Sequence, residues 1–295
     1  HPSPSVMSSS TRRSSRSSTP VRILISVYSI VLILATWILA FLAQCVFWLL
    51  TKPFLSRASQ LYYLGLIFRI CSAPVTACNP FWSFTRHGEL PDERPKKLVI
   101  MCNHVSNLDP FITCRALLPW ESKYIAKSSL FSVPFGGWAM SMSGDVPVYF
   151  TSEKGGWGLA KGSVGKMMDN CKWLVENGIP ITVFPEGVRS GSMEPREYKN
   201  GMFQFCKDND CSILPIALNN THKAWSRKDV LDMADIHIAI GSIIHPDSNL
   251  DVEQLKEKVR GEILKLTASL PNTCYDDIPK PSDKTTEATA VKKDL

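Results

Sequence analysis

Two short patterns that identify common enzyme classes are absent from this chain of 295 residues. No Gly-x-Ser-x-Gly segment occurs, which argues against a serine hydrolase built on a nucleophile elbow. No Cys-x-x-Cys pair occurs among the nine cysteines, so we expect no zinc site and no other bound metal. The cysteines are odd in number and lack the spacing of a disulfide framework, which favours a reducing compartment.

The N-terminal part of the chain lacks negative charge over residues 1–22 and lacks charge of either sign over residues 23–50. Residues 1–22 contain four arginines, many serines and no acid, which is typical of a disordered segment and also of an organelle transit peptide. A basic cytosolic tail is the alternative. Residues 23–50 contain no charged residue at all. A helix of that length reaches about 42 Å, more than the roughly 30 Å core of a bilayer, so we expect a membrane helix.

A second apolar stretch covers residues 61–82 and is interrupted by Arg69 and Pro74. These residues favour an interfacial or re-entrant segment over a simple span. The basic N-terminus is expected to stay in the cytosol. One span would then send the rest of the chain to the lumen, whereas a helical hairpin over residues 23–82 returns it. We predict that such a hairpin anchors the chain to a lipid bilayer.

The net charge is +6, which suits an anionic membrane surface or a phosphate-rich substrate. No basic helical stripe and no known nucleic-acid module occurs, so we expect no nucleic-acid partner.

Residues 83–270 alternate between strand-like and helix-like patterns. Strands are predicted at 97–102, 122–126, 145–149, 180–184, 213–218 and 236–240, and helices near 109–117, 157–177, 200–208 and 250–269. Such alternation predicts one α/β domain, with a mixed, mostly parallel sheet covered by helices. The polar residues 271–295 are predicted to form a disordered tail.

A histidine and an aspartate follow the strand predicted at 97–102. On one helix, His104 and Asp109 would point about 140° apart. They can touch if His104 lies in a turn and Asp109 opens the next helix as its N-cap, with Pro110 in the first helical position. A carboxylate bonded to one imidazole nitrogen fixes the tautomer and makes the other nitrogen a better base. The pair is therefore a candidate catalytic dyad, although a lone histidine is more often a capped or solvated residue.

A second polar turn follows the strand predicted at 180–184. It runs over residues 185–190 and contains one acid, Glu186, and one base, Arg189. In α/β proteins, functional groups gather where strands end. Taken singly, Glu186 also fits a structural cap, and Arg189 also fits a solvated turn residue.

Together these segments resemble the phospholipid/glycerol acyltransferase family, which includes the 1-acylglycerol-3-phosphate acyltransferases. The first family motif, Asn-His-x-Ser-x-x-Asp, is matched at residues 103–109. The third, Phe-Pro-Glu-Gly-Thr-Arg-Ser, is matched at residues 184–190 except for Val188, and the Lys-x-Gly that follows begins at Lys199. The fourth, an apolar strand around a proline, is matched at 213–218.

One position departs from the family pattern. The second family motif ends in Ile-Asp-Arg, and its arginine is thought to hold the acceptor phosphate. Phe150 stands in that place, and phenylalanine offers no hydrogen-bond donor. Lys154 lies close enough in sequence to substitute. The acceptor headgroup is therefore open between 1-acylglycerol 3-phosphate and another lysophospholipid or glycerolipid.

The resemblance implies transfer of a fatty acyl group from acyl-CoA, the co-substrate, to the free hydroxyl of a lysophospholipid, with 1-acylglycerol 3-phosphate as the first choice. In that mechanism His104 takes the hydroxyl proton and Asp109 orients His104, with no acyl-enzyme and no cofactor. The implied acceptor-binding residues are Glu186, Gly187, Arg189, Ser190 and Lys199. Of these, Lys199 also fits plain surface charge.

Other functions are compatible with the same residues. A membrane thioesterase or hydrolase would use His104 and Asp109 to activate water, and a scaffold would use neither. Ser106 is predicted to form the turn rather than act as a nucleophile. Cys102 is a further candidate nucleophile, but adjacent residues rarely pair productively with each other, which argues against a Cys102–His104 pair.

The end of the chain bears on its location. Lys292 and Lys293 stand fourth and third from the carboxyl end, like the dilysine signal of endoplasmic-reticulum membrane proteins. We predict the endoplasmic-reticulum membrane with a cytosolic active site, where acyl-CoA is available. The Ser/Arg-rich N-terminus makes a plastid or mitochondrial membrane the alternative.

Overall fold

The computed structural model describes residues 17–153, 156–159, 162–191, 193, 196–225 and 230–271. The predictions for residues 1–16, Lys154 and the polar tail from 272 onward, including its two lysines, therefore lie outside the described residues.

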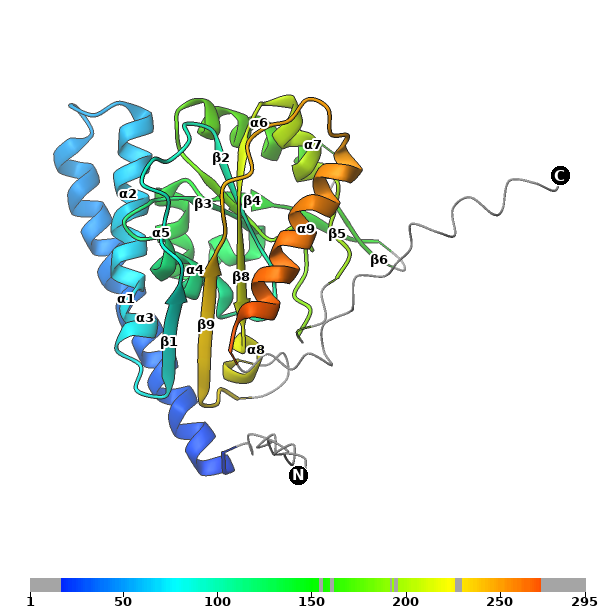
Figure 1. Ribbon diagram of the computed structural model, residues 1–295. Coiled ribbons are helices and arrows are strands. Elements are labelled where there is room, and N and C mark those ends of the chain that lie inside the picture. The colour runs from blue at the N-terminus through cyan, green and yellow to red at the C-terminus, as the bar shows by residue number, and fades with distance from the viewer. Residues whose placement is uncertain are drawn as a thin grey trace, which may run out of the picture.

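The centre of the fold is a seven-stranded sheet with the order β1-β9-β8-β2-β7-β3-β4 (Figure 1). Its strands are β1 (Trp82–His87), β2 (Leu98–Cys102), β3 (Lys123–Lys127), β4 (Val146–Val148), β7 (Ile181–Val183), β8 (Ser212–Asn219) and β9 (Ala234–Ile240). From β8 to β4 all neighbours are parallel, β9 is antiparallel to β8, and β1 is parallel to β9. The predicted mixed, mostly parallel sheet is confirmed.

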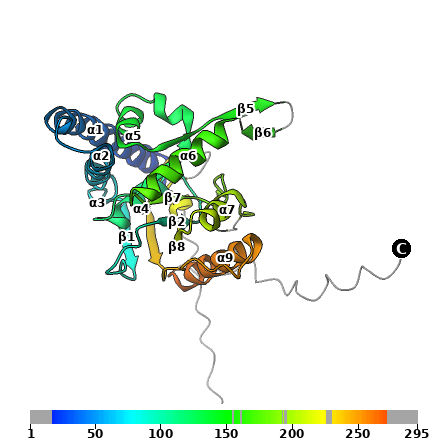
Figure 2. The ribbon, with the colours of Figure 1, turned by 90° about the horizontal axis from the view of Figure 1, so that it is seen from above.

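Helices cover both faces of the sheet (Figures 1 and 2). They are α4 (Asp109–Leu117) on one face, and α6 (Ser163–Glu176), α7 (Gly201–Asp208) and α9 (Val252–Ser269) on the other. In β2, Leu98, Ile100 and Cys102 face the α4 side, while Val99 and Met101 face the other. Every residue of β2 is buried, as expected for a central strand with both faces covered.

Several elements were missed or misplaced by the sequence patterns. The helix predicted from 157 begins at Ser163, because residues 156–159 form β6 and pair with β5 (Phe150–Glu153) in an antiparallel hairpin that extends away from the sheet (Figure 2). The missed elements include β1, the 3-10 helix η1 (Ser128–Ser132), α5 (Gly136–Ser143) and α8 (Thr221–Ala224). The sequence of α5 is almost entirely apolar or small, so it has no amphipathic period to detect.

The N-terminal segment forms two long antiparallel helices at one side of the sheet (Figure 1). α1 covers Thr19–Thr51 and α2 covers Arg57–Ser72, followed by the short α3 (Pro74–Ala77). Helix α1 begins four residues before the predicted apolar segment. Among the described helices, α1 alone is long and apolar enough to cross a membrane, by length and composition.

The second apolar stretch packs on the domain rather than lying apart from it. Arg69 of α2 is 4% exposed and pairs with Asp145, the residue before β4. The Arg69 charge is thus matched inside the protein, and the interfacial or re-entrant character of this segment stays a prediction. The stretch also ends earlier than predicted, since Trp82 already belongs to β1.

Candidate active site

The predicted histidine–aspartate contact is present at the carboxyl end of β2. His104 lies in the turn after β2, and Asp109 is the first residue of α4. The His104 Nδ1 atom lies 2.7 Å from the Asp109 Oδ2 atom. The turn and the helix start thus bring together two side chains that a continuous helix would separate.

Asp109 is fully buried, and its carboxylate is held by four groups. Oδ2 also accepts the backbone N–H groups of Val105, at 2.6 Å, and Ser106, at 2.8 Å. Oδ1 accepts the hydroxyl of Thr221, at 2.6 Å. Hydrogen bonds to both oxygens stabilise the charged carboxylate in a buried position.

The predicted N-cap role of Asp109 is wrong in detail. The N-cap of α4 is Leu108, without a side-chain cap, so Asp109 is the first helical residue and Pro110 is the second rather than the predicted first. The Asp109 carboxylate turns back to amides of the preceding turn instead of capping downstream N–H groups. It therefore fixes the loop that carries His104.

The dyad has the arrangement of a general base. With Asp109 accepting at Nδ1, that nitrogen carries the proton and Nε2 keeps a lone pair. Within the described part of the chain, no residue bonds to Nε2. The imidazole stacks on Phe184 with ring centroids 4.1 Å apart, and its side chain is 18% exposed. A stacked, oriented and accessible imidazole can take a proton from a bound hydroxyl group.

Glu186 is buried, and its carboxylate binds the backbone of His104. Its Oε1 accepts the His104 N–H at 2.8 Å, and its Oε2 accepts the Arg196 N–H at 3.1 Å. Burial raises the pKa of the Glu186 carboxyl, and the two N–H donors offset part of that rise. The carboxyl group thus bonds to backbone groups of the protein, which agrees with the alternative that Glu186 has a structural role.

The rest of the 185–190 turn also joins the His104 loop. Gly187 has φ 72°, a left-handed conformation that favours glycine. The Ser190 N–H and hydroxyl both donate to the His104 carbonyl, at 2.7 and 3.0 Å. The Arg189 guanidinium donates to the Asn107 side chain. Three of the predicted substrate residues, Glu186, Arg189 and Ser190, thus contact the loop that carries His104.

Lys199 is attached to this turn by its backbone. Its N–H donates to the Pro185 carbonyl at 2.8 Å, and its side chain is exposed. This position next to Gly187 is compatible both with an anion-binding role and with surface charge.

The sequence predicted no role for three residues around the dyad, although two of them, Asn103 and Phe184, lie within the matched motifs. Thr221 holds Asp109, Phe184 stacks on His104, and Asn103 pairs both its amide groups with Leu218 at 2.9 Å. The polar residues directly after the apolar strand at 213–218 were the available signal for Thr221. They became informative only with the strand order, because β8 is the neighbour of β2.

The two other candidate nucleophiles have different surroundings. The Ser106 hydroxyl accepts the Leu108 N–H and donates to the Trp225 carbonyl, both at 3.0 Å, so Ser106 forms the turn as predicted. Cys102 is fully buried, and burial raises the pKa of its thiol well above the usual value. A buried neutral thiol is a poor nucleophile.

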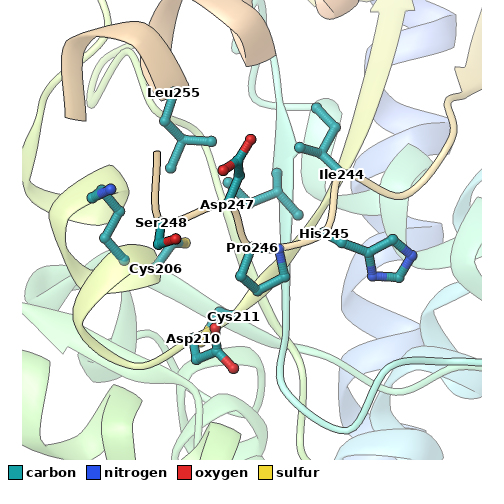
Figure 3. A pocket seen from close by; sticks show the side chains of 11 residues that line it. Cys206, Asp210, Cys211, Ile244, His245, Pro246, Asp247, Ser248 and Leu255 are labelled. Atoms are coloured by element: carbon teal, nitrogen blue, oxygen red, sulfur yellow. The ribbon is translucent and has the colours of Figure 1, made fainter. Parts of the chain in front are cut away.

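A cavity of about 260 Å³ lies at the opposite end of the sheet. Figure 3 shows the side chains that line this cavity. Its lining includes Cys206, Cys211, His245 and Asp247, near the amino end of β8. Because β8 and β2 are parallel, this cavity and the dyad lie at opposite strand ends. Among the described residues, no group of three or more His, Cys, Asp or Glu side chains could hold a metal ion.

The chain resembles known acyltransferases. Residues 84–219 match the Acyltransferase family. A 1-acyl-sn-glycerol-3-phosphate acyltransferase of Chlamydomonas reinhardtii is 27% identical over 197 residues, 65% of this chain and 54% of the relative. A chloroplastic 1-acyl-sn-glycerol-3-phosphate acyltransferase of Brassica napus is 30% identical over 148 residues, 49% of this chain and 41% of the relative. The chain thus spans about half the length of these curated relatives.

A solved structure shares the fold. The 1-acyl-sn-glycerophosphate (LPA) acyltransferase PlsC from Thermotoga maritima superposes with a TM-score of 0.59. The match covers 83% of this chain and 93% of that protein at 15% sequence identity. The family resemblance drawn from the sequence motifs is confirmed.

Proposed function

We propose that this chain transfers a fatty acyl group from acyl-CoA to the free hydroxyl of a lysophospholipid, because residues 84–219 match the Acyltransferase family. The proposed acceptor is 1-acylglycerol 3-phosphate, and the product is phosphatidate. The observation that carries the proposal is the His104–Asp109 dyad, with Nδ1 bound to the carboxylate and Nε2 left as the base.

The proposed reaction needs one base and no covalent enzyme intermediate. His104 Nε2 takes the proton of the acceptor hydroxyl while the hydroxyl oxygen attacks the thioester carbonyl carbon. The tetrahedral intermediate then collapses, the C–S bond breaks, and the CoA sulfur receives the proton from His104. Asp109 stabilises the imidazolium that exists between these two proton transfers.

The acceptor phosphate would meet cations at the same edge of the sheet. Arg189 lies in the turn after β7, and Lys199 is attached to this turn by its N–H, which donates to the Pro185 carbonyl. Lys127 ends β3, which lies parallel and next to β7, so it belongs to the same edge. These three residues are the cations that we propose in place of the arginine missing at Phe150. The two relatives described above are both named 1-acyl-sn-glycerol-3-phosphate acyltransferases, which supports this acceptor.

Membrane association is proposed from the two faces of α1. One face packs on the domain at both ends of the helix: Arg22 pairs with Asp232, and Gln44 donates to Ser143 at 2.9 Å. The opposite face exposes large apolar side chains, among them Leu24, Val31, Leu39, Val46 and Leu49. A helix fixed along the domain at both ends suits insertion of this apolar face into one leaflet, with the domain on the same side.

The proposed location is the cytosolic face of the endoplasmic-reticulum membrane. A plastid membrane is the alternative, because the Brassica napus relative is named chloroplastic. A glycosylation site introduced after residue 83 tests the topology in microsomes. It should stay unmodified, and its glycosylation would place the domain in the lumen and overturn this part of the proposal.

The reaction itself is tested with the protein in phospholipid vesicles and labelled acyl-CoA. The acceptors are 1-acylglycerol 3-phosphate, glycerol 3-phosphate, other lysophospholipids and monoacylglycerol, each with wild type and His104→Ala. Acylation of 1-acylglycerol 3-phosphate that disappears in the variant is the expected result. Preference for another acceptor would reject the proposed acceptor. Acyl-CoA cleavage without acceptor would indicate a thioesterase, and equal rates in both proteins would remove His104 from the mechanism.

A further inference from the structure

A second buried polar network joins α2 to the sheet, and no part of the proposed reaction uses it. Its charged members are Arg69, Glu121, Lys123 and Asp145, each 5% exposed or less. Arg69 lies near both Asp145 and Glu121, and Lys123 lies 2.6 Å from Glu121. Two cations and two anions thus balance each other where α2 meets the start of β3.

The sequence of α2 is adapted to this contact along one stripe. Leu61, Gly65 and Arg69 are four residues apart and share one helix face. The Leu61 carbonyl accepts a hydrogen bond of 2.7 Å from the Lys123 ammonium. A Cβ atom on Gly65 would lie only 1.9 Å from a Glu121 carboxylate oxygen. A larger residue at position 65 would require the buried Glu121 and Lys123 side chains to move, so Gly65 suits the close approach that brings Arg69 to Asp145.

Arg69 and Asp145 together fix Tyr124 of β3. The Arg69 guanidinium lies 4.8 Å from the centre of the Tyr124 ring, a cation–π contact. The Asp145 Oδ1 atom that accepts the Arg69 guanidinium also accepts the Tyr124 N–H, at 2.8 Å. Both the ring and the backbone of Tyr124 are therefore held by the same ion pair.

Tyr124 in turn reaches the helix that carries Asp109. Its hydroxyl lies 2.8 Å from Thr113 Oγ1, and Thr113 Oγ1 donates to the Asp109 carbonyl at 2.9 Å. Since Thr113 donates to that carbonyl, the Tyr124 hydroxyl donates to Thr113. Thr113 is fully buried and Tyr124 nearly so, and both hydrogen bonds are therefore shielded from water.

We propose that Arg69 is a positioning residue, which acts through Tyr124 and Thr113 to hold the first turn of α4 and so the Asp109 carboxylate against His104. The kinetic part of this proposal rests on the proposed acyl transfer. Small displacements of a catalytic pair reduce the rate of the chemical step more than they reduce substrate binding. The helix that follows the apolar α1 would thus also support the dyad.

The test uses conservative variants of full-length protein in vesicles. Thr113→Val and Tyr124→Phe each remove the hydroxyl link, and Arg69→Lys keeps the charge but loses the planar contact with the ring. Tyr28→Phe is the matched control, because the Tyr28 hydroxyl donates to the Cys78 carbonyl, outside this chain of contacts. Folding of each variant is checked by its thermal unfolding midpoint.

We expect the three variants to lower kcat about tenfold with KM for both substrates nearly unchanged, while Tyr28→Phe keeps wild-type kcat. The double variant Thr113→Val/Tyr124→Phe should match the single variants, because they share one hydrogen bond. Unchanged kcat in Tyr124→Phe and Thr113→Val would overturn the proposal. The proposal would also be overturned if the losses of kcat were proportional to the fall in unfolding midpoint and appeared in Tyr28→Phe as well.

Hydrogen exchange of the segment around the dyad gives a readout that does not depend on activity. The Val105 and Ser106 amides donate to Asp109, so they should exchange faster in the three variants and at the wild-type rate in Tyr28→Phe. Wild-type exchange in all variants would reject the positioning role even if no acceptor were acylated. Faster exchange in a protein without transfer activity would support the role and reject only the proposed reaction.

Discussion

The two ends of the central sheet differ in what they offer to a substrate. The carboxyl end of β2 and β7 holds His104, Asp109 and Glu186, with the two carboxylates buried and fully hydrogen bonded. The amino end of β8 holds a cavity of about 260 Å³ near Cys211, where burial raises the pKa of the thiol to about 11. The imidazole of His104 is oriented by a carboxylate and can take a proton, whereas a cavity by itself performs no reaction. We therefore assign function to the end with the dyad.

The largest expected effect comes from removing the base at the carboxyl end. His104→Ala should lower kcat about 10³-fold, because it removes the proposed proton acceptor. His245→Ala, at the cavity, is the matched control and should retain wild-type kcat. Acyl transfer measured in vesicles checks both. A large loss of kcat in His245→Ala would contradict the assignment of function to the carboxyl end of the sheet alone.

Asp109→Asn should come next, with kcat lowered about 10²-fold. The amide keeps the size of the carboxylate but removes the charge that stabilises the imidazolium, and its NH₂ group faces N–H donors. Steady-state kinetics with a check of the unfolding midpoint measures this effect. Full activity in Asp109→Asn would show that His104 works without its carboxylate.

Thr221→Val should have a smaller effect on both stability and rate. The change leaves the Asp109 Oδ1 atom buried without its hydroxyl donor, which costs about 1–3 kcal/mol of unfolding free energy. We expect kcat to fall about tenfold, less than in Asp109→Asn. Denaturant unfolding and kinetics test this, with Thr36→Val on α1 as the control, a buried threonine whose hydroxyl donates to the Ile33 carbonyl of its own helix.

The smallest effect concerns the pH dependence of stability at Glu186. Because burial raises the pKa of this carboxyl in the folded state, its contribution to stability is largest below the unfolded pKa and is lost as pH rises through the folded pKa. Glu186→Gln should remove this slope while adding a constant cost from the amide facing the Arg196 N–H. Unfolding midpoints of both proteins from about pH 4 to 8 measure it. Parallel curves would contradict the role of burial.

The sequence supported local predictions better than distant ones. The His104–Asp109 contact spans five residues, so a turn and a proline sufficed to foresee it. The Thr221–Asp109 bond spans 112 residues and the Arg69–Asp145 pair spans 76, and both depend on a strand order that no pattern encodes. The acidic partners of Arg69 lie far along the chain, so its place in a buried charge network was not predicted. The Asp109 cap was misjudged because upstream amides compete for the same carboxylate.

The close packing of α2 at the start of β3 has a practical consequence for making a soluble enzyme. Truncation before Trp82 would delete Arg69 and leave Glu121 and Asp145 beside a single cation, Lys123, in a site that normally holds two. Uncompensated buried charges commonly cost several kcal/mol, a large part of a domain's stability. A soluble variant should therefore keep both N-terminal helices and instead carry polar replacements for the exposed apolar side chains of α1.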